Sequence, residues 1–329
     1  MERTDLAQGV VQGERRALAR AITLVESHRE DHRIDARALL QSLPKDRQAL
    51  RIGLSGTPGV GKSTFIESFG MMLVGLGLRV AVLAVDPSSS RSGGSILGDK
   101  TRMDRLARAP LAFIRPSPSQ THLGGVARRS REAVALCEAA GFDVVLIETV
   151  GVGQSETVVA EISDLFLLLL APAGGDELQG VKRGIMEIAD MILVNKADGD
   201  LKPAATRTCA DYAGALRLLR KRPQDPDGFP KAALVSALHE EGLARVWDDI
   251  QGLTDWRKQN GFWERTRADQ ARYWFKEDVR NALLSQLETT DARCALNALG
   301  DAVAAGDMIP SEAAAEFLAG LSTNGPSKA

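Results

Sequence analysis

The spacing of apolar residues along this chain changes twice. Residues 14–43 carry apolar side chains at partly helical intervals, and Pro44 ends this region. Short, nearly continuous apolar runs then alternate with helical patterns as far as about residue 242. These runs are LRIGLSG, RVAVLAVD, LAFIRPS, DVVLIETV, DLFLLLLAP, MILVNKAD and KAALVSAL. The pattern beyond them is helical again.

The alternating part predicts an α/β fold. A strand buried on both faces is apolar along its whole length, and such strands separated by helices indicate a mostly parallel sheet with helices on both faces. We therefore predict an N-terminal helical extension (1–48), an α/β domain (49–258) and a C-terminal helical region (259–329). Ligands of such sheets bind at the carboxyl ends of the strands, which is where the polar motifs of this chain fall.

A glycine-rich loop follows the first apolar run. The segment GLSGTPGVGKSTF contains Gly56-x-x-x-x-Gly61-Lys62-Ser63 between a strand pattern and a helix pattern, which favours a phosphate-binding loop over an ordinary glycine turn. Its backbone N–H groups and the helix N-terminus attract phosphate, Lys62 can reach the β- and γ-phosphates, and Ser63 can ligate Mg²⁺. The domain is thus predicted to be a P-loop NTPase. The predicted nucleotide contacts here are Gly56, Thr57, Pro58, Gly59, Val60, Gly61, Lys62, Ser63 and Thr64.

Two later motifs indicate guanine as the base. Asn195-Lys196-x-Asp198 follows a strand-like run, and the Asp198 carboxylate can accept hydrogen bonds from N1–H and the 2-amino group of guanine. Adenine would leave this carboxylate unpaired, at a cost of about 1–3 kcal/mol or more. The stem of Lys196 can pack along the base. After the next run, Ser236-Ala237-Leu238 matches the loop whose backbone N–H meets guanine O6, so we predict GTP and GDP as ligands.

Carboxylates near the ends of two runs are candidate magnesium ligands. Asp86 ends the second run, and Asp99 follows a Ser/Gly/Arg-rich segment that we interpret as the first switch. Either residue can bind Mg²⁺ directly or through water, although each could instead cap a turn or a helix. Glu148, where most GTPases carry Asp, can hold a metal-bound water, and Gly151 can offer its N–H to the γ-phosphate. The predicted metal residues are Ser63, Asp86, Asp99 and Glu148.

The candidate catalytic groups are Lys62, Glu148, Gln154 and Lys182. Many GTPases place a water-orienting Gln directly after the glycine that corresponds to Gly151, but here that residue is Val152. Gln154 is the candidate replacement, and we predict slow hydrolysis that a partner accelerates. Lys182 ends a glycine-containing loop that could sense the nucleotide, or could be an ordinary loop and helix start.

Composition limits the remaining possibilities. The formal net charge of −2 gives no global attraction to nucleic acid or acidic lipid. Cys137, Cys209 and Cys294 are far apart, the N-terminus has no secretory pattern, and no apolar run could span a bilayer, so we predict a cytoplasmic protein. A metal site at the pair His28 and His32 is less favoured than a solvated helix face.

The C-terminal helical part is rich in tryptophan. Trp247, Trp256, Trp263 and Trp274 all follow the last strand-like run. They could pack on the core of their own chain or form a dimer interface, where Trp and Tyr are enriched. We predict a homodimer that is formed by this region.

The motifs together resemble one family. GTPGVGKST, DPSSSRSGGSILGDKTRM, ETVGVGQSE, NKAD and SAL, in this order between Leu50 and Leu238, are similar to the metallocentre-assembly P-loop GTPases and most of all to the MeaB/ArgK/MMAA family. Glu148 matches the Glu that marks this class. The resemblance implies a GTPase chaperone that gates adenosylcobalamin loading into methylmalonyl-CoA mutase and protects the mutase. The mutase partner rests on the resemblance alone.

Three other functions are weighed against this one. The first is a nickel-type metallocentre-assembly GTPase, but such proteins commonly carry Cys or His metal motifs. The second is a regulatory GTP-binding module with little turnover. The third is a P-loop kinase, which the guanine motif disfavours.

Overall fold

The structure is a computed structural model of the chain. It describes residues 3–27, 29–85, 103–116, 123–149, 155–172 and 183–323. The chain forms two compact units, Met1–Gln270 and Ala271–Ala329. The predicted division at residues 48 and 258 stays a prediction.

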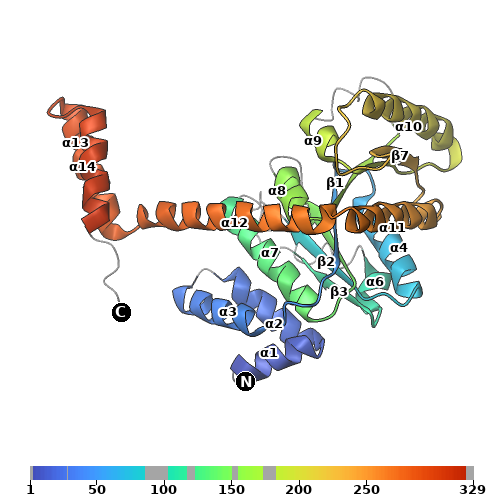
Figure 1. Cartoon of the computed structure of the whole chain (residues 1–329), viewed down its shortest axis with the longest axis horizontal. Coiled ribbons are helices and arrows are strands. Elements are labelled where there is room, and N and C mark those ends of the chain that lie inside the picture. The colour runs from blue at the N-terminus through green and yellow to red at the C-terminus, as the bar shows by residue number, and fades with distance from the viewer. Residues whose placement is uncertain are drawn as a thin grey trace. The chain divides into compact units, whose positions relative to one another are not determined.

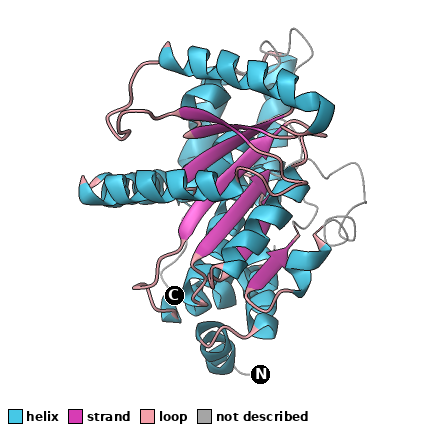
Figure 2. Cartoon of the chain, turned by 90° about the vertical axis from the view of Figure 1, so that its right-hand side faces the viewer, coloured by secondary structure: helices cyan, strands magenta, loops and turns pink. Residues whose placement is uncertain are grey.

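The first unit is built on a seven-stranded sheet with the order β3-β2-β4-β1-β5-β6-β7. Figure 2 shows this sheet in magenta with helices packed around it. Every neighbouring pair is parallel, so the predicted α/β sheet is confirmed. Each predicted apolar run contains one strand. The strands are β1 (Leu50–Gly56), β2 (Val80–Val85), β3 (Ala112–Arg115), β4 (Val144–Thr149), β5 (Leu165–Leu170), β6 (Met191–Val194) and β7 (Lys231–Leu234).

Alternating side chains of the strands build a separate layer on each face of the sheet. On one face, Ile52 and Leu54 of β1 belong to a core with α4 (Lys62–Gly75), α6 (Asp104–Arg108) and α11 (Leu243–Gln259). Phe69 of α4 meets Trp247 of α11 edge to face, with ring centroids 6.1 Å apart. Trp247 therefore packs in the core of its own chain, which is the first of the two alternatives that the sequence left open for the tryptophans.

The opposite face is covered by the remaining helices of the α/β domain. These are α7 (Leu123–Ala139), α8 (Ser155–Ile162), α9 (Arg183–Ile188) and α10 (Lys202–Arg217), the last preceded by the short helix η2 (Gly199–Leu201). Helix α8 lies very close to β1, because a Cβ at Gly53 would stand 2.9 Å from Val159 Cγ1. A glycine is therefore needed at the centre of the strand that leads to the phosphate loop.

Three N-terminal helices pack together and against α7 (Figure 1). They are α1 (Arg3–Val11), α2 (Arg15–Glu26) and α3 (Glu30–Ser42). The sequence predicted α2 and α3 as one helical region with a polar break but did not predict α1. His32 lies in the first turn of α3 and its Nδ1 is 2.9 Å from Ser27 Oγ, whereas His28 is outside the described residues. Within the described ranges, no group of three or more His, Cys, Asp or Glu residues is arranged to hold a metal ion.

The C-terminal helices are α12 (Phe262–Gln286), α13 (Thr290–Ala305) and α14 (Pro310–Thr323). Helix α12 begins in the first unit, where Arg267 pairs with Asp164 at 2.6 Å and lies over the Trp263 ring. Its second half belongs to the second unit, in which α13 and α14 pack on each other. None of the described helices is long and apolar enough to cross a membrane.

A buried ion cluster joins α11 to the amino-terminal end of the sheet. Arg257 Nη2 is 2.6 Å from Asp190 Oδ1 and 2.8 Å from Asp225 Oδ1. Arg222 pairs with the same two carboxylates, so two cations neutralise two anions. Asp190 also accepts the Phe166 N–H of β5 at 2.8 Å. The cluster therefore ties one helix and the segment before β7 to the edges of β5 and β6.

Replacing Arg257 by Met should destabilise the protein by about 3–5 kcal/mol, because two buried carboxylates, Asp190 and Asp225, would then share a single cation, Arg222. Urea unfolding followed by circular dichroism measures the change. Arg245 lies on the exposed side of the same helix, and Arg245→Met is the matched control, with an expected effect within about 0.5 kcal/mol. Equal unfolding midpoints for the two variants would show that the cluster contributes nothing.

Candidate functional site

The predicted phosphate loop connects β1 to α4, as the motif requires. Gly61 precedes the helix with φ 86°, a left-handed conformation that favours glycine. A Cβ there would lie 2.7 Å from Asn195 Nδ2, and a Cβ at Gly56 would lie 2.4 Å from Leu169 O. Both glycines are therefore needed for backbone shape and for close approach. The loop they produce places successive backbone groups at the N-terminus of α4, the arrangement that binds phosphate.

Lys62 is the first residue of α4 and its side chain turns back over the loop. Its Nζ donates to Gly56 O at 2.8 Å. Burial lowers the pKa of Lys62, while the nearby carboxylates Glu148 and Glu156 act in the opposite direction. The ammonium is thus held over the loop that would receive the β- and γ-phosphates. Ser63 follows on the first turn, where its hydroxyl is placed to serve a metal ion bound with the nucleotide.

Asn195 joins three loops that are far apart in the sequence. Its side chain is buried, with 2% of the residue exposed. Nδ2 donates to Val60 O of the phosphate loop at 2.9 Å, and Oδ1 accepts the Ala237 N–H at 3.0 Å. One amide group therefore fixes the distance between the phosphate loop and the loop after β7.

The remaining residues of the guanine motifs converge on the same place. Lys196 has φ 58° and its Nζ donates to Gly59 O at 2.7 Å, so its stem crosses towards the phosphate loop. The Ser236 hydroxyl donates to Asp198 Oδ2 and accepts the His239 N–H at 3.2 Å. Asp198 is only partly buried, which leaves its carboxylate reachable by a base. The structure thus brings together all the described residues that were predicted to contact the nucleotide.

Two backbone N–H groups of the loop after β7, those of Ala237 and Leu238, differ in whether they are free to bind a ligand. Because the Ala237 N–H donates to Asn195, it is occupied in this structure. The Leu238 N–H has no acceptor in the described part of the chain, and the Leu238 side chain is 72% exposed. The predicted hydrogen bond to guanine O6 therefore needs either the Leu238 amide or a shift of the Ala237 amide.

Sequence reasoning missed Ser68 on α4. Its hydroxyl is buried and donates to Ala237 O at 2.7 Å, across 169 positions of the chain. A helical serine usually bonds to a carbonyl of its own helix, so this contact with another loop is a specific feature. Its signal in the sequence was a polar residue between the apolar Ile66 and Phe69 on the core side of the helix.

Glu148 lies in β4, beside β1, and is 4% exposed. Its charge acts on Lys62, which places the carboxylate that marks the predicted GTPase class close to the phosphate loop. The next residue, Thr149, donates from Oγ1 to Ser55 Oγ at 3.2 Å and links β4 to the start of the loop. The predicted residues Asp86, Asp99, Gly151, Val152, Gln154 and Lys182 lie outside the described residues. Their roles stay predictions.

Comparison with known proteins agrees with this geometry. The profile described as "Methylmalonyl Co-A mutase-associated GTPase MeaB" matches residues 18–292. This chain belongs to the MeaB family. The resemblance seen in the motifs is thereby confirmed, and so is the prediction of a P-loop GTPase.

Several relatives cover most of the chain. A "Putative GTPase" of Caulobacter vibrioides is 54% identical over 95% of this chain and 96% of its own length. "GTPase ArgK" of Escherichia coli is 48% identical over 84% of this chain and 83% of its own. The "Methylmalonic aciduria type A homolog, mitochondrial" of Mus musculus is also 48% identical, over 86% and 71%. The crystal structure of a "LAO/AO transport system kinase" superposes with a TM-score of 0.75 at 36% identity and covers 97% of both chains.

Replacing Ser68 by Ala should weaken GDP binding about 5–10-fold, because the loop after β7 would lose the bond that fixes the Ala237 carbonyl, worth roughly 1 kcal/mol. The loss should be smaller for the 2-aminopurine ribonucleoside diphosphate, which has no O6 acceptor. Calorimetric titration of both ligands measures the two ratios.

The matched control is Ser285→Ala, which removes an exposed hydroxyl bonded within its own helix. It should leave both affinities unchanged. If Ser68→Ala weakened the two ligands equally, its hydroxyl would serve general packing and not the base-reading loop.

Proposed function

We propose that this GTPase is a chaperone of a cobalamin-dependent methylmalonyl-CoA mutase, which gates adenosylcobalamin loading and protects the mutase. The family description names the mutase as the associated protein, and one relative is named after methylmalonic aciduria. The proposal requires that the protein change with the bound nucleotide. The observation that supports this is the Asn195 side chain, which bridges the phosphate loop and the loop after β7. A partner that distinguishes GTP from GDP could use coupling of about 1–3 kcal/mol, typical of such switches.

Hydrolysis in this proposal needs in-line attack of water on the γ-phosphate. Lys62 and the loop amides would stabilise the charge on the phosphate oxygens. Ser63 and Glu148 would hold Mg²⁺ and its water, together with Asp86 and Asp99; the ion would neutralise phosphate charge. Lys62 and Glu148 are already close enough to interact, which supports this arrangement. Gln154 would orient the water in place of Val152, and Lys182 would relay the nucleotide state to the mutase.

The competing functions differ in measurable output. A nickel-type assembly GTPase would bind Ni²⁺, a regulatory module would release little phosphate under any condition, and a kinase would transfer phosphate to another molecule. The kinase alternative is kept because the solved structure that is 36% identical is called a transport system kinase. Asn195 and Ser236 hold the loop after β7 beside Asp198, an arrangement that would suit guanine and supports the GTPase.

Purified mutase should raise steady-state phosphate release by this protein at least about 10-fold, which corresponds to roughly 1.4 kcal/mol of barrier. The reason is that Val152 cannot orient water and that Gln154, two residues further on, would need the partner to bring it to the γ-phosphate. Lys182→Ala should reduce the stimulated rate more than GTP affinity, whereas Lys202→Ala, at an exposed lysine on α10, should change neither. Rapid single-turnover hydrolysis that ignores the mutase would contradict partner activation.

We further propose that the protein is a cytoplasmic homodimer. Phe275, Val279 and Leu283 recur every four residues on α12, and their exposed fractions are 68%, 44% and 58%. Such a contiguous apolar stripe on one helix face typically marks an interface. The three cysteines are free, which fits a reducing compartment.

The double substitution F275E/L283E should convert the dimer to a monomer, because two charges would be buried in the apolar contact. Light scattering after size-exclusion chromatography gives the mass directly. Arg293→Glu, on the neighbouring helix α13, is the surface control and should stay dimeric. A wild-type protein that is monomeric at all concentrations would refute the dimer.

A further inference from the structure

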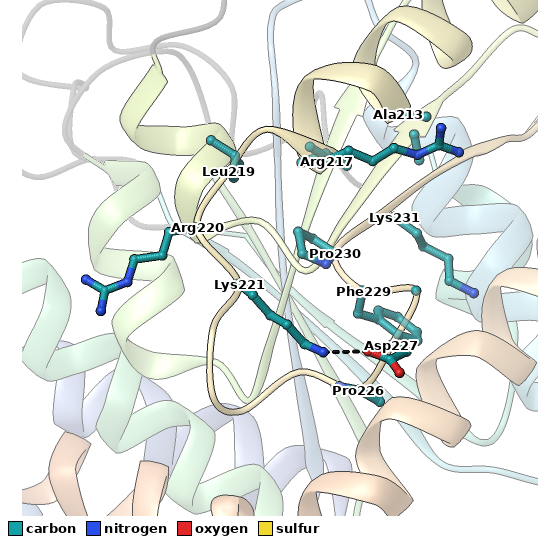
Figure 3. Close-up of a pocket in the computed structure, with 13 residues that line it drawn as sticks. Ala213, Arg217, Leu219, Arg220, Lys221, Pro226, Asp227, Phe229, Pro230 and Lys231 are labelled. Carbon is teal, nitrogen blue, oxygen red and sulfur yellow. Dashed lines mark hydrogen bonds and ion pairs between the residues drawn. The ribbon is translucent and has the colours of Figure 1, made fainter.

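A cavity of about 410 Å³ lies at the amino-terminal end of β7 (Figure 3). Its walls are the last turn of α10, the connecting segment 218–230 and the first residues of β7. The nucleotide motifs follow the opposite, carboxyl-terminal ends of β1, β6 and β7. The cavity is therefore separate from the nucleotide site, and none of the predicted nucleotide contacts lines it.

The walls of this cavity are fixed by the core. Arg222 and Asp225 in the connecting segment belong to the buried ion cluster with Asp190 and Arg257. Lys231 pairs with Asp249 of α11 at 2.6 Å and lies 4.5 Å above the centre of the Phe229 ring. The cavity is thus held open between anchored groups, so a ligand would not need to order a loose loop.

The lining carries an excess of positive charge. Of its four cationic residues, Lys221 is paired with Asp227 and Lys231 with Asp249. The side chains of the other two, Arg217 and Arg220, form no hydrogen bond or ion pair with the described part of the chain. Both residues are exposed, and in Figure 3 their side chains extend in opposite directions, so one anionic group could contact only one of them at a time. An anion beside either guanidinium would meet charge that is suited to carboxylate or phosphate oxygens.

The size and the apolar part of the lining limit the ligand further. The volume lies in the range of small-molecule pockets and far exceeds what one phosphate needs. Leu216 is buried, and Phe229 and Pro230 are partly buried in the wall. We propose that this cavity binds a small organic anion, with a compact apolar or planar body and one phosphate or carboxylate group.

Pyridoxal 5′-phosphate tests the proposal, because it combines a planar ring and a phosphate with an aldehyde that condenses with a lysine amine and releases water. Borohydride then reduces the imine to a stable amine that peptide mass spectrometry locates. The full-length protein is used with saturating GDP, which keeps the probe out of the phosphate loop. Lys221 or Lys231 should be labelled at least about 5-fold faster than the exposed lysines Lys202 and Lys276.

The double variant R217E/R220E should lose this preference, and R245E, an exposed arginine of α11, should keep it. Circular dichroism confirms that each variant is folded. Protection by phenyl phosphate or by benzoate supports the proposal and shows which anionic group is preferred. Protection by neither, labelling no faster than at Lys202 and Lys276, or an unchanged preference in R217E/R220E would overturn it. None of these outcomes depends on the mutase.

Discussion

The side-chain amide of Asn195 is the constraint on which the nucleotide site depends. It is buried between Val60 O and the Ala237 N–H, so both halves of the amide are satisfied inside the protein. A buried amide that loses one partner costs about 1–3 kcal/mol, and this cost opposes any separation of the two loops. Ala237 is held from both sides, because its N–H donates to Asn195 and its carbonyl accepts a hydrogen bond from the Ser68 hydroxyl. The phosphate loop, its helix and the base loop therefore form one hydrogen-bonded unit.

Two lysines make this unit responsive to a ligand. Lys62 donates to Gly56 O and Lys196 donates to Gly59 O, so each ammonium binds a carbonyl of the loop that is expected to receive phosphate. Neutral carbonyls are weaker partners for an ammonium than phosphate oxygens. Burial of Lys62 disfavours its charged form, whereas an anionic phosphate would favour it. Nucleotide binding would therefore raise the pKa of Lys62, so that its protonated form is favoured, and would release the Gly56 carbonyl that Lys62 contacts.

The sequence predicted the parts of this protein that local patterns encode. Continuous apolar runs predicted every strand of the sheet, because a strand buried on both faces has no polar side. The glycines of the phosphate loop were recognisable because a Cβ at Gly56 or Gly61 would collide with the backbone or with Asn195. Helix α1 was missed, and Ser68 and the cluster of Arg222, Arg257, Asp190 and Asp225 were not found. Ser68 and the cluster depend on contacts between residues far apart in the chain, which no local spacing records, whereas α1 was missed because its apolar residues form almost no helical stripe.

The two guanine motifs are linked through the rest of the fold as well as through Asn195. Helix α10 starts a few residues after Asp198, and β7 ends just before Ser236, so both motifs sit at one end of the same helix–strand pair. The segment that joins α10 to β7 at the far end is fixed by Arg222 and Asp225 in the buried cluster. A shift of that segment would have to break charged pairs in a buried place, which is costly. The cluster therefore holds the residues that are predicted to bind the base in register from the opposite end of the sheet, and a ligand bound beside it would act on a stiff element connected to the predicted guanine site.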